Sequence, residues 1–234
     1  MAAKLPKSTL QELDNLMVVL RRGSAEEREA AMTRLHDFEK GGKLPVAALI
    51  DMAGESDPTL SMYAIGALGR NGSAQAVSTL SELAERHRAG NVLMLETIVD
   101  ALGHTGDRGA APMLLSLLGI QLKGWTSKLF GRRGKKKDDG TPEAAKRREH
   151  LALPVIRALE KLHEPRAVEV LGDFLEHPDP IVRWHMIQLL VVNNWNGFNG
   201  RLERMAESDQ DELVRDMAGI ALRKIQALPP HMNN

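Results

Sequence analysis

Apolar residues recur along this chain at the spacing of buried helix faces, and one dipeptide position repeats five times. A small or apolar residue followed by leucine stands at Ala67-Leu68, Ala101-Leu102, Ala158-Leu159, Leu189-Leu190 and Ala221-Leu222. The steps between successive copies are 34, 57, 31 and 32 residues, so the long step exceeds the ordinary period by about 25 residues. Self-similarity at this period is typical of helical repeat arrays, in which one unit cannot bury its apolar face alone. The pattern predicts an all-α fold of stacked helix pairs with one insertion.

Each repeat reads as a first helix, a break and a capped second helix. Five second helices begin after a side chain that can accept hydrogen bonds from free backbone N–H groups: Ser24, Asp57, Asn91, Asp179 and Asp211. In two copies a proline follows the cap, where its missing N–H costs nothing. We expect second helices over residues 24–39, 58–70, 92–103, 148–162, 180–193 and 212–227. First helices are expected over residues 9–22, 45–54, 74–89, 110–122, 166–176 and 200–207.

The second helices resemble those of the HEAT-repeat superfamily, particularly the short bacterial HEAT-like repeats of the PBS-lyase type. In that family the second helix reads as Asp, two residues, Val-Arg, two residues, Ala and then Ala-Leu. Residues 179–183 and 211–215 carry the Asp and the Val-Arg, and residues 63–69 carry an Ala-Leu-Gly ending. Ser61 and Leu95 replace the arginine in other copies, and the fourth copy lacks the capping aspartate. The resemblance implies a right-handed α-solenoid of about six helix pairs, and it specifies fold rather than function.

The domain organisation follows from this pattern. We expect one HEAT-like domain over residues 1–228, a basic insertion loop over 120–148 in the fourth repeat, and a flexible tail over 229–234. The chain has 43% hydrophobic residues and no cysteine, so it can bury a core but has no disulfide, thiolate ligand or thiol nucleophile. Its first 20 residues contain Glu12 and Asp14 and lack a long apolar run. Neither a signal peptide nor a membrane span is expected, and we predict a cytoplasmic protein.

Charge is distributed unevenly although the total is zero. The chain has 31 basic and 31 acidic residues. Residues 119–149 contain six Lys and four Arg against two Asp and two Glu, a net charge of +6, which leaves −6 on the rest. An acidic body is therefore predicted to display a basic loop.

Motifs for catalysis, metal binding and nucleotide binding are missing from the sequence. An Asp and an Arg recur at fixed spacing in the repeats. We interpret the arginines, Arg183 and Arg215, as staples, which means that each bridges to a neighbouring repeat, and not as catalytic groups. No two of the eight histidines are three or four positions apart. Residues 131–135 contain Gly and Lys but lack the earlier Gly and the following Ser or Thr of a phosphate-binding loop. We expect no catalytic residue, no metal and no cofactor.

The insertion is the first candidate binding segment, because a repeat can close with a loop of a few residues. Apolar and basic residues of its first half fall at the spacing of a basic amphipathic helix. Three interpretations stay open: a solvated flexible loop, a docking element for an acidic protein surface, or attraction to phosphates of an anionic membrane or nucleic acid. The candidate partner-binding residues are Trp125, Lys128, Phe130, Arg132, Arg133, Lys135, Lys136 and Lys137.

The polar and aromatic run of residues 193–200 is the second candidate. Trp195 and Phe198 either plug the groove between the fifth and sixth repeats, with asparagines in turn conformations, or form an aromatic recognition patch.

Three hypotheses for the function follow. The leading one is a non-catalytic scaffold or adaptor whose concave face, lined by the second helices, holds another protein, while the insertion attaches to an acidic surface. The alternative is a phosphate-directed binder of nucleic acid or an anionic membrane, although an acidic body disfavours wrapping a duplex. A third is an enzyme of the HEAT-like lyase or glycosylase type, which only the fold suggests.

Overall fold

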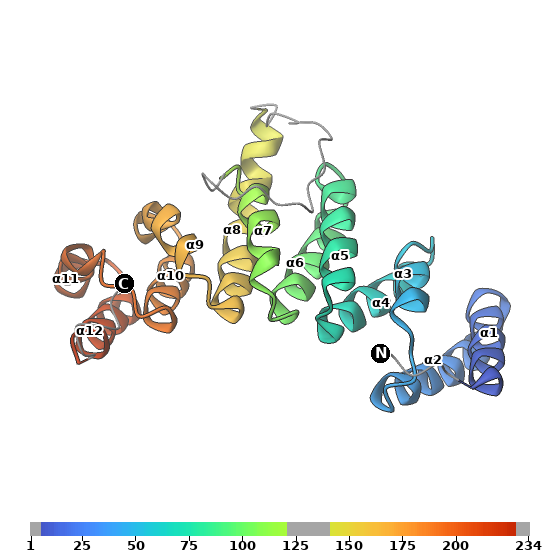
Figure 1. The fold of residues 1–234 in the computed structure, drawn as a ribbon. Helices are drawn as coiled ribbons and strands as arrows, with labels where there is room; N and C mark the ends of the chain where they lie inside the picture. Colours follow the sequence, from blue (N-terminus) through green and yellow to red (C-terminus); the bar gives the residue numbers. More distant parts are fainter. Residues whose placement is uncertain (1–5, 121–140, 228–234) are drawn as a thin grey trace.

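The structure is a computed structural model that describes residues 6–120 and 141–227 (Figure 1). In these two ranges the chain forms α-helices and two short 3₁₀ helices, and no strand. The helices are α1 (Lys7–Arg22), α2 (Ala25–Lys40), α3 (Val46–Ala53), α4 (Pro58–Asn71), α5 (Ala74–His87), α6 (Val92–His104), η1 (Arg108–Ala110), α7 (Ala111–Leu117), α8 (Pro142–Leu162), α9 (Pro165–Val170), η2 (Gly172–Glu176), α10 (Pro180–Val192), α11 (Asn199–Ser208) and α12 (Glu212–Gln226).

The helices are arranged as six consecutive pairs along an arc (Figure 1). The first helices are α1, α3, α5, α7 with η1, α9 with η2, and α11; each pairs with the helix that follows it. The second helices α4, α6, α8, α10 and α12 also pack against one another in chain order. Because each pair contacts mainly its neighbours in sequence, the fold is an all-α solenoid, and this prediction is confirmed.

The main differences from the predicted elements flank the gap between the two described ranges. Helix α8 begins at Pro142, six residues earlier than predicted, and the Thr141 side chain accepts a hydrogen bond from the Ala144 N–H at its start. Residues 142–148, predicted to belong to the insertion, therefore form the first turns of α8. Helix α7 ends at Leu117 rather than at residue 122. The Lys- and Arg-rich start of α8 resembled a loop because no capping aspartate stands at its usual place in the repeat.

All five predicted caps are present at the starts of second helices. The acceptors and the N–H groups that they bind are Ser24 with Glu27, Asp57 with Thr59 and Leu60, Asn91 with Met94, Asp179 with Ile181, and Asp211 with Val214. The Glu27 carboxylate also accepts from the Ser24 N–H, which completes a capping box. Each cap is worth about 1 kcal/mol, so these residues define where the second helices begin.

Small residues let successive second helices approach closely. A Cβ added to Gly69 would lie 2.8 Å from the Ala101 Cα, and a Cβ added to Gly103 would lie 2.7 Å from the Ala158 Cα. The leucine after each of these alanines is fully buried. In these two copies the dipeptide thus combines a small residue that contacts the preceding second helix with a core leucine.

The first helix pair is joined to the second pair largely by polar contacts. Glu39 of α2 accepts hydrogen bonds from the Arg70 Nε at 2.7 Å and from the Tyr63 hydroxyl at 2.9 Å. Arg21 of α1 also forms an ion pair with Glu55, which follows α3. The buried residues nevertheless form one continuous core from Leu13 to Ile225.

Candidate functional site

The second helices share an outward surface on the side opposite the buried core. Residues at 3.6-residue spacing share this side, because the opposite side of each helix is buried in the core. We call it the second-helix face. Its members are Thr59, Tyr63, Gly66 and Arg70 of α4; Leu93, Glu96, Asp100 and His104 of α6; His150, Leu153, Arg157 and Lys161 of α8; Ile181, Trp184, His185 and Gln188 of α10; and Leu213, Asp216, Ile220 and Lys224 of α12.

Polar contacts connect neighbouring helices across this face. The pairs, with their closest N···O distances, are His150 with Glu96 at 2.8 Å, Lys161 with Asp100 at 2.8 Å, and His185 with Glu160 at 2.8 Å. The first two join α6 to α8, and the third joins α8 to α10. Surface pairs of this kind contribute little individually, but together they hold the side chains of the face in defined positions.

The same contacts change the acidity of the groups involved. The Arg70 hydrogen bond lowers the pKa of Glu39 below its usual value despite the partial burial of that carboxyl. Partial burial favours a higher pKa for Asp100, but the hydrogen bond and charge of Lys161 outweigh it, so the pKa is lowered. Burial and the neighbouring Glu39 raise the pKa of Tyr63 well above its ordinary range. Both carboxylates are therefore charged at neutral pH and the phenol is neutral.

Arg183 forms the predicted staple between repeats. Its Nη2 donates to Asp209 Oδ1 at 2.6 Å and its Nε to Asp209 Oδ2 at 3.0 Å, while Nη1 binds the carbonyl oxygens of His177 and Pro178. The Arg183 and Asp209 side chains are only 12% and 8% exposed. Burial favours a higher pKa for Asp209, but the bonds from Arg183 and the Asp211 N–H outweigh it and lower the pKa.

Arg215 occupies the same position one repeat later and makes only part of this set of contacts. Its Nη1 donates to the Asp209 and Gln210 carbonyl oxygens at 2.7 and 3.4 Å. Among the described residues its Nε and Nη2 have no acceptor. Arg215 thus holds the turn before its own helix and makes no bridge to a further repeat, so the staple interpretation fits Arg183 and fails for Arg215.

Exposed apolar side chains collect on the second-helix face. In the described parts of the chain, six large apolar side chains are classed as exposed, and four of them are on this face: Leu93, Ile181, Leu213 and Ile220. Leu93, Ile181 and Leu213 are 60%, 55% and 71% exposed, and each stands nine residues before the leucine of the repeated dipeptide. The other two, Leu10 and Val18, are on α1.

Trp195 and Phe198 both pack against the core at the junction of the fifth and sixth pairs. The Phe198 ring lies where a Gly172 Cβ would be, and Arg201 stacks over it at 5.4 Å from the ring centroid. The indole Nε1 of Trp195 is buried without a hydrogen-bond partner in the structure. This placement agrees with the plug interpretation, and a partner-binding role for the two aromatics stays a prediction.

A groove of about 550 Å³ opens beside these residues, between η2, α10 and α11. Its polar lining includes the Arg183–Asp209 pair and Arg201, whose Nη1 donates to the Gly172 carbonyl oxygen at 2.9 Å. Two of its guanidinium groups therefore make contacts that the fold itself requires.

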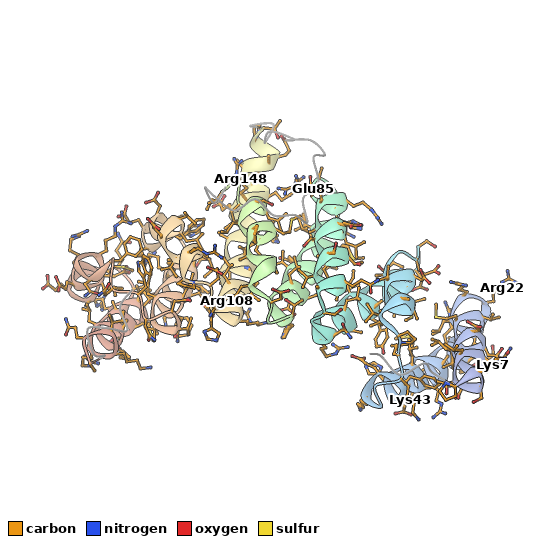
Figure 2. The ribbon with its side chains drawn as sticks, in the orientation of Figure 1. Lys7, Arg22, Lys43, Glu85, Arg108 and Arg148 are labelled. Atoms are coloured by element: carbon orange, nitrogen blue, oxygen red, sulfur yellow. The ribbon has the colours of Figure 1, made fainter. Side chains whose placement is uncertain are left out.

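The candidate residues of the insertion lie outside the described residues. These are Trp125, Lys128, Phe130, Arg132, Arg133, Lys135, Lys136 and Lys137. Figure 2 labels Glu85 in the last turn of α5 and Arg148 in the second turn of α8. Nearby, Arg88 binds the Ser116 hydroxyl and carbonyl oxygens, and Arg147 donates to the Ala89 carbonyl at 3.4 Å with its Nε buried and unpaired.

Metal-binding chemistry finds no support in residues 6–120 and 141–227, where no three His, Asp or Glu side chains converge. No helix in these ranges is long and apolar enough to cross a bilayer.

Comparison with known proteins identifies the repeats. No curated protein matches the chain. A family model described as HEAT repeats matches residues 46–121, which contain helices α3 to α7. Repeats of this family are commonly protein-interaction scaffolds. The chain is therefore similar to HEAT repeats over this segment, and the same helix pairing continues on both sides of it.

Proposed function

We propose that this chain is a non-catalytic adaptor that holds another protein on its second-helix face. The observation that carries the proposal is the collection of exposed apolar side chains on that face, four of the six in the described residues. Exposed apolar groups that recur at one position of a repeat are costly in water and mark interaction surfaces. The family commonly serves as a protein-interaction scaffold, which agrees with this assignment.

The geometry of the face also suits protein binding. Polar contacts between α6, α8 and α10 fix its side chains before a partner arrives. Preorganised side chains lose less conformational entropy on binding, so a larger share of the contact energy becomes affinity.

We further propose that the basic segment at residues 121–140 provides a second attachment point for an acidic protein surface. It carries seven Lys or Arg and two Asp in the sequence, a net charge of +5. The same charge would attract phosphates of nucleic acid or an anionic membrane, which is the alternative function. The two differ in whether the bound partner survives nuclease and detergent.

Affinity capture from the native cell lysate, treated with nuclease and detergent, tests the proposal. The bait is the whole chain, beside a variant in which a short Gly-Ser linker replaces residues 121–140. The start of α8 at Pro142 decides these limits, since a longer deletion would remove turns of that helix. A second variant carries Gln188→Lys on the second-helix face, and its matched control carries Gln75→Lys on α5.

We expect a stoichiometric protein partner that the α5 control retains and the face variant loses. Loss from the linker variant alone would locate attachment at residues 121–140. Capture of nucleic acid or lipid before treatment, with no protein afterwards, would contradict the adaptor function and favour phosphate binding.

A further inference from the structure

The exposed apolar positions of the second-helix face form a row. Leu93 of α6, Ile181 of α10 and Leu213 of α12 occupy the same position in their repeats, at the second residue of each helix. We call these three residues the apolar row. In α8, between α6 and α10, the same position is held by His150, which is paired with Glu96. The three apolar side chains are not needed to cap their helices. The caps are formed by the side-chain oxygens of Asn91, Asp179 and Asp211.

The spacing of the row matches one kind of ligand. Neighbouring packed helices have axes about 8–10 Å apart, so Ile181 and Leu213 on adjacent helices are separated by about that distance along the array. Seven residues of an α-helix rise about 10.5 Å. In a helix that lies along the array, every seventh side chain would therefore meet one repeat. This match holds for either direction of the bound helix.

The charges around the row indicate the character of that helix. Asp179, Glu212 and Asp216 are exposed on α10 and α12 beside Ile181 and Leu213, and no ion pair in the described residues uses them. The nearest arginines on these helices, Arg183 and Arg215, are turned to the loops that precede the helices. The ends of α10 and α12 at the row are thus apolar and acidic.

From this juxtaposition we infer that the apolar row binds an amphipathic helix of a partner protein, with an apolar residue at every seventh position and Lys or Arg on either side of that stripe. The inference rests on the proposed adaptor function and names the ligand of its second-helix face. Apolar contacts at Ile181 and Leu213 supply affinity, and the three carboxylates select a basic helix over an acidic one. Ile220, seven residues after Leu213 on the same face, extends the apolar surface.

A designed peptide tests the inference on the purified whole chain. The probe is a 22-residue helical peptide with leucine at every seventh position and lysines beside this stripe. A matched peptide has glutamate in place of each lysine. The protein is used unchanged, as Ile181→Ser with Leu213→Ser, and as Leu10→Ser with Val18→Ser, which removes the exposed apolar residues of α1 as a control. Binding is measured by fluorescence anisotropy, and circular dichroism checks that each variant is folded.

We expect the lysine peptide to bind the unchanged chain and the α1 control equally. The row variant should bind it at least about tenfold more weakly, because each lost apolar side chain removes buried area from the complex. Reversing charge with Glu212→Lys and Asp216→Lys should transfer the preference to the glutamate peptide.

The inference is overturned if the lysine peptide does not bind, if both peptides bind alike, or if the row variant binds as well as the unchanged chain. The capture experiment separates this failure from failure of the adaptor function. A protein partner that is lost with Gln188→Lys but kept when Ile181 and Leu213 are replaced would support the adaptor function and refute binding of a basic helix to the apolar row.

Discussion

Arg183 and Arg215 provide a comparison of one residue at one position in two successive repeats. Replacing Arg183 with Ala removes two bonds to the Asp209 carboxylate and two to carbonyl oxygens. In the unchanged chain the Asp209 side chain is only 8% exposed, and without Arg183 its remaining donor is the Asp211 N–H at 3.0 Å. Arg215→Ala removes only two bonds to carbonyl oxygens.

The two changes should lower the free energy of unfolding by different amounts, because only Arg183→Ala leaves a buried carboxylate without its positively charged partner. Removing one partner of a buried ion pair costs about 3–5 kcal/mol, and the small exposure of this pair reduces the expected loss for Arg183→Ala to about 3 kcal/mol. Lost bonds to carbonyl groups that water can reach cost about 1 kcal/mol, which is our expectation for Arg215→Ala. The difference should be about 2 kcal/mol in the free energy of unfolding.

Chemical denaturation at pH 7, followed by circular dichroism, measures both changes. Hydrogen exchange should show the Arg183→Ala loss concentrated in α11 and α12, since Asp209 stands between them. Adding Asp209→Ala to Arg183→Ala should recover part of the lost free energy of unfolding, because the unpaired carboxylate is then removed. Equal losses for the two arginines would refute the staple.

The pH dependence gives an independent check. The pKa of Asp209 is lower in the folded chain than in the unfolded chain, so its contribution is present above the unfolded value of about 3.9 and disappears as the pH falls through the folded value. Unfolding of the unchanged chain should therefore become easier below about pH 4, and Arg183→Ala should weaken this dependence.

Two further predictions concern other junctions. Gly103→Ala should destabilise the chain by about 1–3 kcal/mol, because the new Cβ would lie 2.7 Å from the Ala158 Cα; Gly66→Ala, whose Cβ would meet only a flexible guanidinium, should stabilise it by about 0.5–1 kcal/mol in thermal melts. Tyr63 is the single tyrosine, so absorbance at 295 nm during alkaline titration reports its ionisation alone. Glu39→Gln should lower the pKa of Tyr63 by removing the adjacent negative charge, and an unchanged titration would disprove that contact.

The sequence predicts the fold well where a repeat carries its own local signals. Asp57 and Asp179 show where helices start because an N-terminal cap acts through the next two or three residues, and the alanine-leucine dipeptides mark the buried side. The start of α8 was missed because Thr141 caps it outside the repeat register. The signal was present, since Thr-Pro-Glu at residues 141–143 is a helix start in its own right.

The proposed binding surface was less predictable. Charge and aromatic content directed attention to residues 121–140 and to Trp195, which the structure packs against the core. Leu93, Ile181 and Leu213 were overlooked because an aliphatic residue near a helix start is normally a core residue. Only alignment of the repeats by the dipeptide leucine nine positions later shows that all three lie opposite the core.

The close approach of Gly69 to Ala101 and of Gly103 to Ala158 has a mechanical consequence. Helices that touch through backbone atoms cannot slide or tilt without losing many contacts at once. Helices α4, α6 and α8 should therefore move as one rigid body. At the next two junctions Glu160 and Val191 replace these glycines, and α2 is attached through the flexible side chains of Glu39 and Arg70. Bending should therefore be concentrated at the two ends of the arc. The end helix pairs would move relative to the rigid central pairs when a partner binds.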